Sequence, residues 1–384
     1  MATVRSALIA AATLAATLAA PEALSATAAL AAPAPLTGPA TSIEVVATGL
    51  NAPRGLLYDP RRHRVLVAEA GVAAGNTGPC GFAERGLFMC LGHTGSVLEY
   101  RESSGTAGRI ITGLPSTALQ DGPTVVIGLH DVALHHRQLI GAFGTLGNQP
   151  YRESLGPGGA LLGQVVRLRE SGRHRPVGDI LGFQDTLHPG HIEANPYGLL
   201  ADLPSTVIVA NAGGPGGNQG NDLLAVHRSG SVVQLAQFPE RVPVADPDVL
   251  IRSVPTTVAR GPDGALYVGE LSGDPFFPGE ARVWRVVPGQ PPTVHAQGFT
   301  TIIDIAFDHL GRLIVLQTGP NPFDSALEGA LIRVAADGQR TELARAGLTN
   351  PGGVAVAGPG VFYVTSGLAT GGNAGRLLRL QVSD

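Results

Sequence analysis

Lysine is absent from this chain, so all 26 of its basic residues are arginine. The absence excludes a phosphate-binding loop of the lysine-containing type, and it excludes catalysis through a lysine Schiff base or a lysine general base. The arginines are scattered singly along the sequence, and the formal net charge is −4. Because no basic stripe is present, we expect no nucleic-acid partner.

Cysteine and aromatic residues are also scarce. Aromatic residues make up 5% of the chain, which weighs against a sugar-binding groove built from stacked rings. No serine lies in a Gly-x-Ser-x-Gly sequence, so nothing points to a serine nucleophile on a strand–helix turn. The two cysteines, Cys80 and Cys90, share one predicted loop. In an exported chain such a pair predicts a disulfide, and the alternatives are free thiols or half of a metal site.

The N-terminal residues have the pattern of a secretion signal. Arg5 precedes an apolar stretch from Ala7 to Ala20, and small residues suited to cleavage follow at positions 26–31. We therefore predict a signal peptide over residues 1–31, a disordered linker over residues 32–42 and a mature start near residues 29–33. The apolar stretch is short for a membrane span, so we expect no span and a secreted protein.

A repeated phrase fills the rest of the chain. Each copy has a short apolar run, a turn containing Gly or Asp, a second run, a polar loop and a third run. Runs of period two bounded by turn residues predict strands, and a few strands repeated as a unit predict a propeller blade. No amphipathic helix is evident among them. The six units begin near Pro53, Ile127, Asn195, Thr256, Ile303 and Pro351.

The two ends of the repeat region complement each other. The last unit stops after its third strand, and an extra strand over residues 43–50 precedes the first unit. If the extra strand completes the last blade, no blade is left with an open edge. The sequence thus predicts an all-β fold: one six-bladed β-propeller of four-stranded blades over residues 43–384, closed by its N-terminal strand. We expect a monomer.

Polar residues recur where the strands of a propeller meet its central channel. Carboxylate and amide oxygens from several blades are suitable ligands for a hard cation. We therefore predict that Glu69, Asn211, Glu270 and Asp304 bind Ca²⁺ or another divalent cation. The alternative is a polar channel that holds only water. The full set of candidates for the channel mouth is Glu69, His130, Asp131, Glu193, Asn195, Asn211, Glu270 and Asp304.

Several phrases together match a known family. They lie at residues 46–56, in the loop from Gly78 to Cys90, at residues 221–224 and at residues 267–271. With them the chain resembles the ScyD/ScyE family of exported proteins, which is related to NHL-type and gluconolactonase-type six-bladed propellers. The resemblance spans residues 41–384 and implies fold and export, but no catalytic residues.

The resemblance also suggests a ligand set. Gluconolactonase-type relatives hold a divalent cation in the channel mouth with one Glu, two Asn and one Asp. This chain has the same residue types at comparable places. They are Glu69, Asn195, Asn211 and Asp304.

Two functions from different classes remain open. The favoured one is a secreted, non-enzymatic binding or scaffold protein for a small molecule or an extracellular protein. The other is a divalent-metal-dependent lactone or ester hydrolase, in which the cation polarises a carbonyl and activates water. Folds of this kind host both functions, so the channel residues decide between them.

Overall fold

The computed structural model describes residues 41–383, apart from residues 121–124, 190–192, 214–219 and 245. The predicted signal peptide over residues 1–31 lies outside the described residues, as does nearly all of the predicted linker over residues 32–42. The first strand begins at Thr41, two positions before the predicted start at Ile43.

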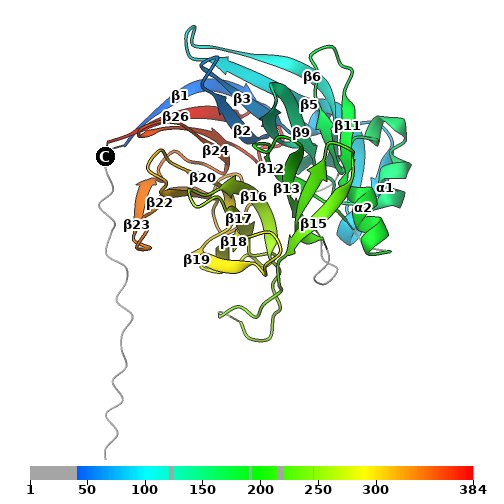
Figure 1. Ribbon diagram of the computed structural model, residues 1–384. Coiled ribbons are helices and arrows are strands. Elements are labelled where there is room, and N and C mark those ends of the chain that lie inside the picture. The colour runs from blue at the N-terminus through cyan, green and yellow to red at the C-terminus, as the bar shows by residue number, and fades with distance from the viewer. Residues whose placement is uncertain (1–40, 121–124, 190–192, 214–219, 245, 384) are drawn as a thin grey trace, which may run out of the picture. The chain divides into compact units, whose positions relative to one another are not determined.

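The described residues form six antiparallel sheets, which are arranged as the blades of a propeller (Figure 1). The inner strands are β2 (Pro53–Asp59), β8 (Leu129–His135), β12 (Pro196–Leu200), β16 (Val254–Arg260), β20 (Ile302–Phe307) and β24 (Pro351–Gly358). The second strands are β3 (Arg64–Glu69), β9 (Gln138–Phe143), β13 (Thr206–Ala212), β17 (Leu266–Leu271), β21 (Leu313–Gln317) and β25 (Val361–Ser366).

The outer half of each blade follows the same order. The third strands are β5 (Phe88–Arg101), β10 (Gln164–Arg167), β14 (Asn221–His227), β18 (Ala281–Val286), β22 (Ala330–Val334) and β26 (Gly375–Val382). The outer strands are β6 (Thr106–Leu119), β11 (Arg175–Asp179), β15 (Val232–Gln237), β19 (Thr293–Phe299), β23 (Arg340–Ala344) and β1 (Thr41–Leu50). Within each sheet the strands pair in the order of the sequence, except that β1 pairs with β26 in the last blade and β3 pairs with β5 in the first. The predicted all-β, six-bladed propeller is therefore confirmed.

The second strands carry much of the core. All residues of β3 and β13 are buried, because neighbouring blades cover both faces of each sheet. A strand covered on both faces reads as a continuous apolar run rather than an alternating one. The core lies between blades: Leu66 of β3 packs in one cluster with Leu129 of β8 and Val166 of β10.

The N-terminal strand closes the ring, as predicted. β1 pairs antiparallel with β26, from Thr41 opposite Val382 to Leu50 opposite Gly375. A second link joins the first and last blades, because Glu102 accepts hydrogen bonds from the hydroxyls of Tyr58 at 2.8 Å and Tyr363 at 2.7 Å.

The first blade is larger than the four-stranded unit expected from the repeat. β5 and β6 are 14 residues long each, and their ends pair with two short extra strands, β4 (Cys80–Phe82) and β7 (Val126–Ile127). Cys80 lies directly opposite Cys90 in the β4–β5 pair, and the two form a disulfide. The predicted disulfide is confirmed.

We expect the double variant Cys80→Ser, Cys90→Ser to be less stable by about 2–3 kcal/mol, because the bond closes a short loop in the unfolded chain. The loss should appear as a lower melting temperature in calorimetry. Wild-type protein melted with a reductant should match the variant. Free thiols that titrate stoichiometrically in the denatured, non-reduced protein would contradict the prediction.

Two short helices were not expected from the sequence. They are α1 (Gln149–Ser154) and α2 (Ile180–Leu187), with 3₁₀ turns η1 (Ala73–Gly75), η2 (Glu84–Gly86) and η3 (Pro157–Gly159). Side chains cap both helices: Asn148 accepts from the Tyr151 N–H at 3.0 Å, and Asp179 accepts from the Gly182 N–H at 3.0 Å. Runs this short leave no helical period in the sequence. Neither these helices nor any other in the described ranges has the length and apolarity to cross a membrane.

Candidate functional site

Each inner strand contains a β-bulge at the same place. In β8, Leu129 is opposite Phe143, but Asp131 is already opposite Ala142. The same shift occurs at the matching position of the other five inner strands. A bulge places two neighbouring residues opposite one partner and re-aims their side chains. The bulges therefore create two equivalent positions in every blade.

These two positions form two rings around the channel, which we call the first and second bulge rings. The first bulge ring consists of Arg54, His130, Tyr197, Thr256, Ile303 and Gly352. The second bulge ring lies one residue further along each strand and consists of Gly55, Asp131, Gly198, Thr257, Asp304 and Gly353.

In the first bulge ring, Arg54 reaches across to a blade that is not its neighbour. Its Nη1 donates to the Tyr197 hydroxyl at 3.2 Å, and its Nη2 donates to the Val126 carbonyl at 2.7 Å. The His130 ring packs on Tyr197, with 4.5 Å between ring centroids. Arg54, His130 and Tyr197 are 7%, 0% and 9% exposed, so this part of the channel is closely packed and polar.

The second bulge ring contains two carboxyl groups from opposite blades. The Asp131 carboxylate accepts from the backbone N–H of Val132 and, in the next blade, of Leu199, both at 2.8 Å. The Asp304 carboxylate accepts from the N–H of Ile305 and, in the next blade, of Val354, again both at 2.8 Å. Both aspartates thus tie neighbouring inner strands together in the same way.

Two further groups shape this ring. The Thr257 hydroxyl donates a third hydrogen bond to Asp304, at 2.6 Å. Gly55 leaves room for Asp131, because a Cβ atom at residue 55 would stand 2.2 Å from its carboxylate. Both aspartates are only partly buried by surface area, as expected of side chains that line a channel.

The surroundings shift the acidity of these groups. Burial raises the pKa of Asp304 to about 6, although its three hydrogen-bond donors act in the opposite direction. Burial, and then the charge of Asp304, raise the pKa of Asp131 well above its usual value. Burial, and then the charge of Arg54, lower the pKa of His130 well below its usual value. At neutral pH the His130 ring is therefore uncharged.

Two other predicted residues, Glu69 and Asn211, lie near the ends of second strands, and Gln317 has the same position in the fifth blade. The Glu69 carboxylate accepts from Arg109, with Nε–Oε2 at 2.7 Å and Nη2–Oε1 at 2.8 Å, and from the Asn51 N–H at 2.7 Å. Asn211 accepts from the Asn195 N–H at 2.9 Å. Gln317 binds the Thr300 N–H in the same way, at 3.0 Å. These side chains hold the segment that enters the inner strand, which is a structural role.

Glu270 occupies the same position in the fourth blade, and its partners are again structural. Its carboxylate accepts from Trp284 Nε1 at 2.6 Å and lies 2.7 Å from Arg241 Nη2. Burial raises its pKa to about 7, against the opposing effect of Arg241. Glu193 and Asn195, which precede β12, are buried at 3% and 8% exposure.

The residues predicted to bind a cation already have partners within the protein. Glu69 and Glu270 come from opposite blades, and each is already paired with an arginine. The residues suggested by the family resemblance are likewise spread over different blades. They are Glu69, Asn195, Asn211 and Asp304. Across the described ranges, no group of three or more His, Cys, Asp or Glu side chains is placed to hold a metal ion.

Sequence analysis missed Arg54 and Tyr197, although a signal for them exists. Pro-Arg-Gly-Leu-Leu at residues 53–57 and Pro-Tyr-Gly-Leu-Leu at residues 196–200 are the same phrase with one residue changed. The changed residue occupies the first bulge ring in both blades. Comparing the six phrases by position would have indicated both residues.

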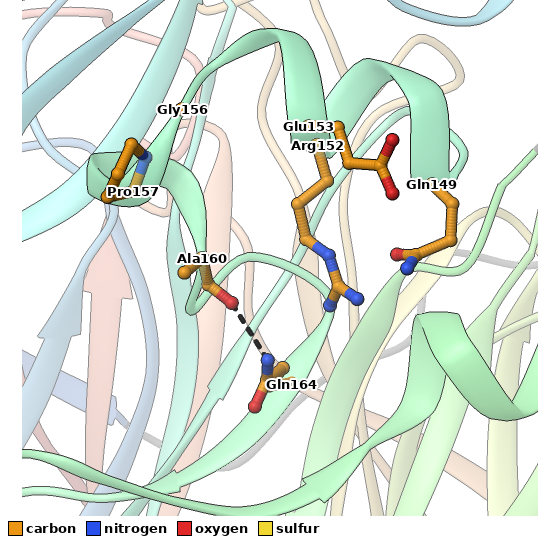
Figure 2. Close-up of a pocket in the computed structure, with 7 residues that line it drawn as sticks. All are labelled: Gln149, Arg152, Glu153, Gly156, Pro157, Ala160 and Gln164. Carbon is orange, nitrogen blue, oxygen red and sulfur yellow. Dashed lines mark hydrogen bonds between the residues drawn. The ribbon is translucent and has the colours of Figure 1, made fainter.

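An open pocket of about 440 Å³ lies elsewhere, against α1, η3 and the start of β10 (Figure 2). Arg152 is its cationic group, and both terminal nitrogens of that side chain bind the Asp179 carboxylate at 2.8 Å. Gln164, on the other side, donates to the Ala160 carbonyl at 2.8 Å. Because Arg152 is already paired with Asp179, this pocket offers no candidate site comparable to the bulge rings.

The fold is shared with solved structures of low sequence identity. A glucose dehydrogenase is 14% identical, with a TM-score of 0.55, over 89% of this chain and 100% of that chain. A gluconolactonase from Xanthomonas campestris is 13% identical, with a TM-score of 0.52, over 89% of this chain and 90% of that chain. A soluble aldose sugar dehydrogenase from Escherichia coli is 14% identical, with a TM-score of 0.50, over 90% and 100%.

These likenesses show a common fold. They confirm the predicted relation to gluconolactonase-type propellers at that level, while membership of the ScyD/ScyE family stays a prediction. No protein-family model matches the sequence, and no curated protein sequence matches it.

Proposed function

We propose that the protein hydrolyses lactones or esters in its central channel, using two carboxyl groups of the second bulge ring. The observation that carries the proposal is the opposed pair Asp131 and Asp304, whose pKa values are both raised. Paired carboxyl groups whose surroundings separate their protonation states are the usual basis of general acid–base catalysis. The structural neighbours named above are enzymes, which favours hydrolysis over the non-enzymatic binding function preferred from the sequence.

The two carboxyl groups have different roles because their surroundings differ. Asp304 has three hydrogen-bond donors, which favour its ionised form, and a pKa of about 6. It is therefore ionised near neutral pH yet still basic enough to take a proton. Burial, and then the charge of Asp304, raise the pKa of Asp131, so that it keeps its proton at a pH at which an ordinary aspartate is ionised. We assign Asp304 as the general base and Asp131 as the general acid.

The reaction then needs only water as a second reactant. Water attacks the carbonyl carbon while Asp304 takes one of its protons, and a tetrahedral intermediate forms. The bond from this carbon to the alkoxy oxygen breaks, and Asp131 gives its proton to that oxygen. The products are a carboxylic acid and an alcohol, joined as one hydroxy acid when the substrate is a lactone. Proton exchange with solvent returns Asp304 and Asp131 to their starting states.

Measurement of kcat/KM on a panel of lactones and esters tests the assignment. We expect Asp304→Asn to lose at least about 100-fold, because an amide cannot act as a base. In the wild type, kcat/KM should fall as the pH drops below about 6, where Asp304 takes up a proton. A chelator should leave the activity unchanged.

Asp263→Asn is the matched control, since it makes the same change outside both bulge rings, between β16 and β17. It should retain wild-type activity. Absence of turnover by the wild type across the panel would contradict the proposal and leave a binding protein. Activity that requires a divalent cation and survives Asp304→Asn would also contradict it.

The disulfide bears on the location of the protein. Disulfides persist in oxidising compartments, and Cys80–Cys90 is formed here. Together with the signal-peptide pattern of residues 1–31, this supports export, and we propose that the protein acts outside the cell.

A further inference from the structure

The guanidinium of Arg54 is a buried cation for which the proposed reaction has no use. Its two hydrogen bonds go to neutral groups, the Tyr197 hydroxyl and the Val126 carbonyl. Within the described part of the chain it forms no ion pair, and its Nε has no partner. A guanidinium presents five N–H donors and does not lose its proton in proteins. Three of the five donors of Arg54 are therefore unused.

Such a group is costly unless something neutralises it. Burying an unpaired charge is unfavourable because the ion loses its hydration, and buried charges are therefore normally paired. Two other arginines with buried side chains are each paired with a carboxylate. Arg64 lies 2.7 Å from Glu99, and Arg241 lies 2.7 Å from Glu270. Among the described residues, no carboxylate lies within ion-pair distance of Arg54.

The groups beside Arg54 also have unused hydrogen-bonding atoms. Both ring nitrogens of His130 and the Oδ1 of Asn195 are buried and lack a well-formed hydrogen bond among the described residues, although the backbone of Pro196 lies beside the His130 ring. These two side chains adjoin each other, because a Cβ atom at Gly144 would stand 2.4 Å from His130 Nδ1 and 2.5 Å from Asn195 Oδ1. A neutral His130 ring can donate one N–H to an anion.

The two bulge rings also separate opposite charges along the channel. Arg54 lies in the first ring, and the two carboxyl groups lie one residue further along the inner strands. This order of charges matches a ligand whose anionic end faces the first ring and whose carbonyl faces the second.

We propose that Arg54, with His130 and Tyr197 beside it, binds a carboxylate of the substrate, so that the protein acts on lactones or esters that carry a carboxylate group. The assignment of the substrate rests on the hydrolase function proposed above. The anion site itself rests only on the first bulge ring.

Titration calorimetry with sodium acetate tests the anion site without any turnover. Acetate should bind the wild type at one site, and Arg54→Gln should weaken binding at least ten-fold. Arg260→Gln is the control, because it removes one positive charge from an exposed ion pair with Asp202. It should bind acetate as the wild type does. No acetate binding by the wild type, or equal binding by both variants, would overturn the site.

A second variant covers the case in which Arg54→Gln does not fold. Asn195→Asp places a negative charge at an oxygen that has no partner among the described residues. The substitution keeps the hydrogen bond from the backbone N–H of residue 195 to Asn211. It should weaken acetate binding at least ten-fold through repulsion. Undiminished binding would count against the site.

Two esters separate this inference from the hydrolase proposal. The wild type should hydrolyse monomethyl succinate with a kcat/KM at least ten-fold above that for neutral dimethyl succinate, and Arg54→Gln should remove the preference. Equal rates for the two esters would leave the hydrolase standing and overturn the carboxylate assignment. Acetate binding without hydrolysis of either ester would support the anion site and overturn the hydrolase.

Discussion

A chain that begins at Asn51 should be much less stable than a chain that begins at Thr41. The ten residues between these starts form β1, which pairs with β26 and completes the last blade. Without them the edge of β26 is unpaired, and an unpaired edge invites association with other chains. Leu50, which is fully buried, contributes about 2 kcal/mol by burial alone. We expect the melting temperature to fall by more than about 10 °C.

Calorimetry and size-exclusion chromatography on the two chains measure this effect. The chain from Thr41 is the control, since both variants lack residues 1–40. The shorter chain should also form soluble aggregates through its open edge. Equal melting temperatures would show that β1 does not close the ring.

Arg109→Ala should destabilise the protein by about 3–5 kcal/mol, because it leaves a buried carboxylate without its cation. Glu69 is 0% exposed, and Arg109 contacts both of its oxygens. The remaining donors of Glu69, Ser96 and the Asn51 N–H, cannot neutralise its charge. Chemical denaturation of the variant and the wild type measures the difference.

Arg260→Ala is the matched control for this prediction. The Arg260–Asp202 pair has a similar geometry, but its side chains are 31% and 34% exposed. An exposed pair contributes no more than about 1 kcal/mol. In addition, the double variant Arg109→Ala, Glu69→Gln should be more stable than Arg109→Ala alone. Equal losses for Arg109→Ala and Arg260→Ala would mean that burial of Glu69 has no energetic consequence.

The blades and their closure could be predicted because their signals are local. Alternating apolar runs and glycine turns mark strands within a few residues. The missing last strand is found by counting the strands in each unit. His130, Asp131 and Asp304 could also be predicted, since they are polar residues in otherwise apolar inner strands. Two helices of six and eight residues were too short to leave a period.

The remaining site residues depend on partners far away in the sequence. Nothing near Glu69 shows that Arg109, 40 positions later, will bind it. A carboxylate at the end of a strand can face the channel or accept a backbone N–H, and only the folded arrangement distinguishes the two. Glu69, Asn211 and Glu270 were predicted to face the channel. In the structure all three bind donors that belong to the blades.

The repeated bulge has a consequence for how such a protein can change its specificity. Two positions in each of six blades make twelve sites. Tyr197 and Ile303 also pack in an apolar cluster between blades, and the four glycines have no room for a Cβ atom. The other six sites are polar: Arg54, His130, Asp131, Thr256, Thr257 and Asp304. Substitutions at these six alter the charge of the channel while the apolar packing between blades is conserved. Selection for a new substrate can therefore act on six codons without altering that packing, and a focused library at the same codons offers a direct route to redesign.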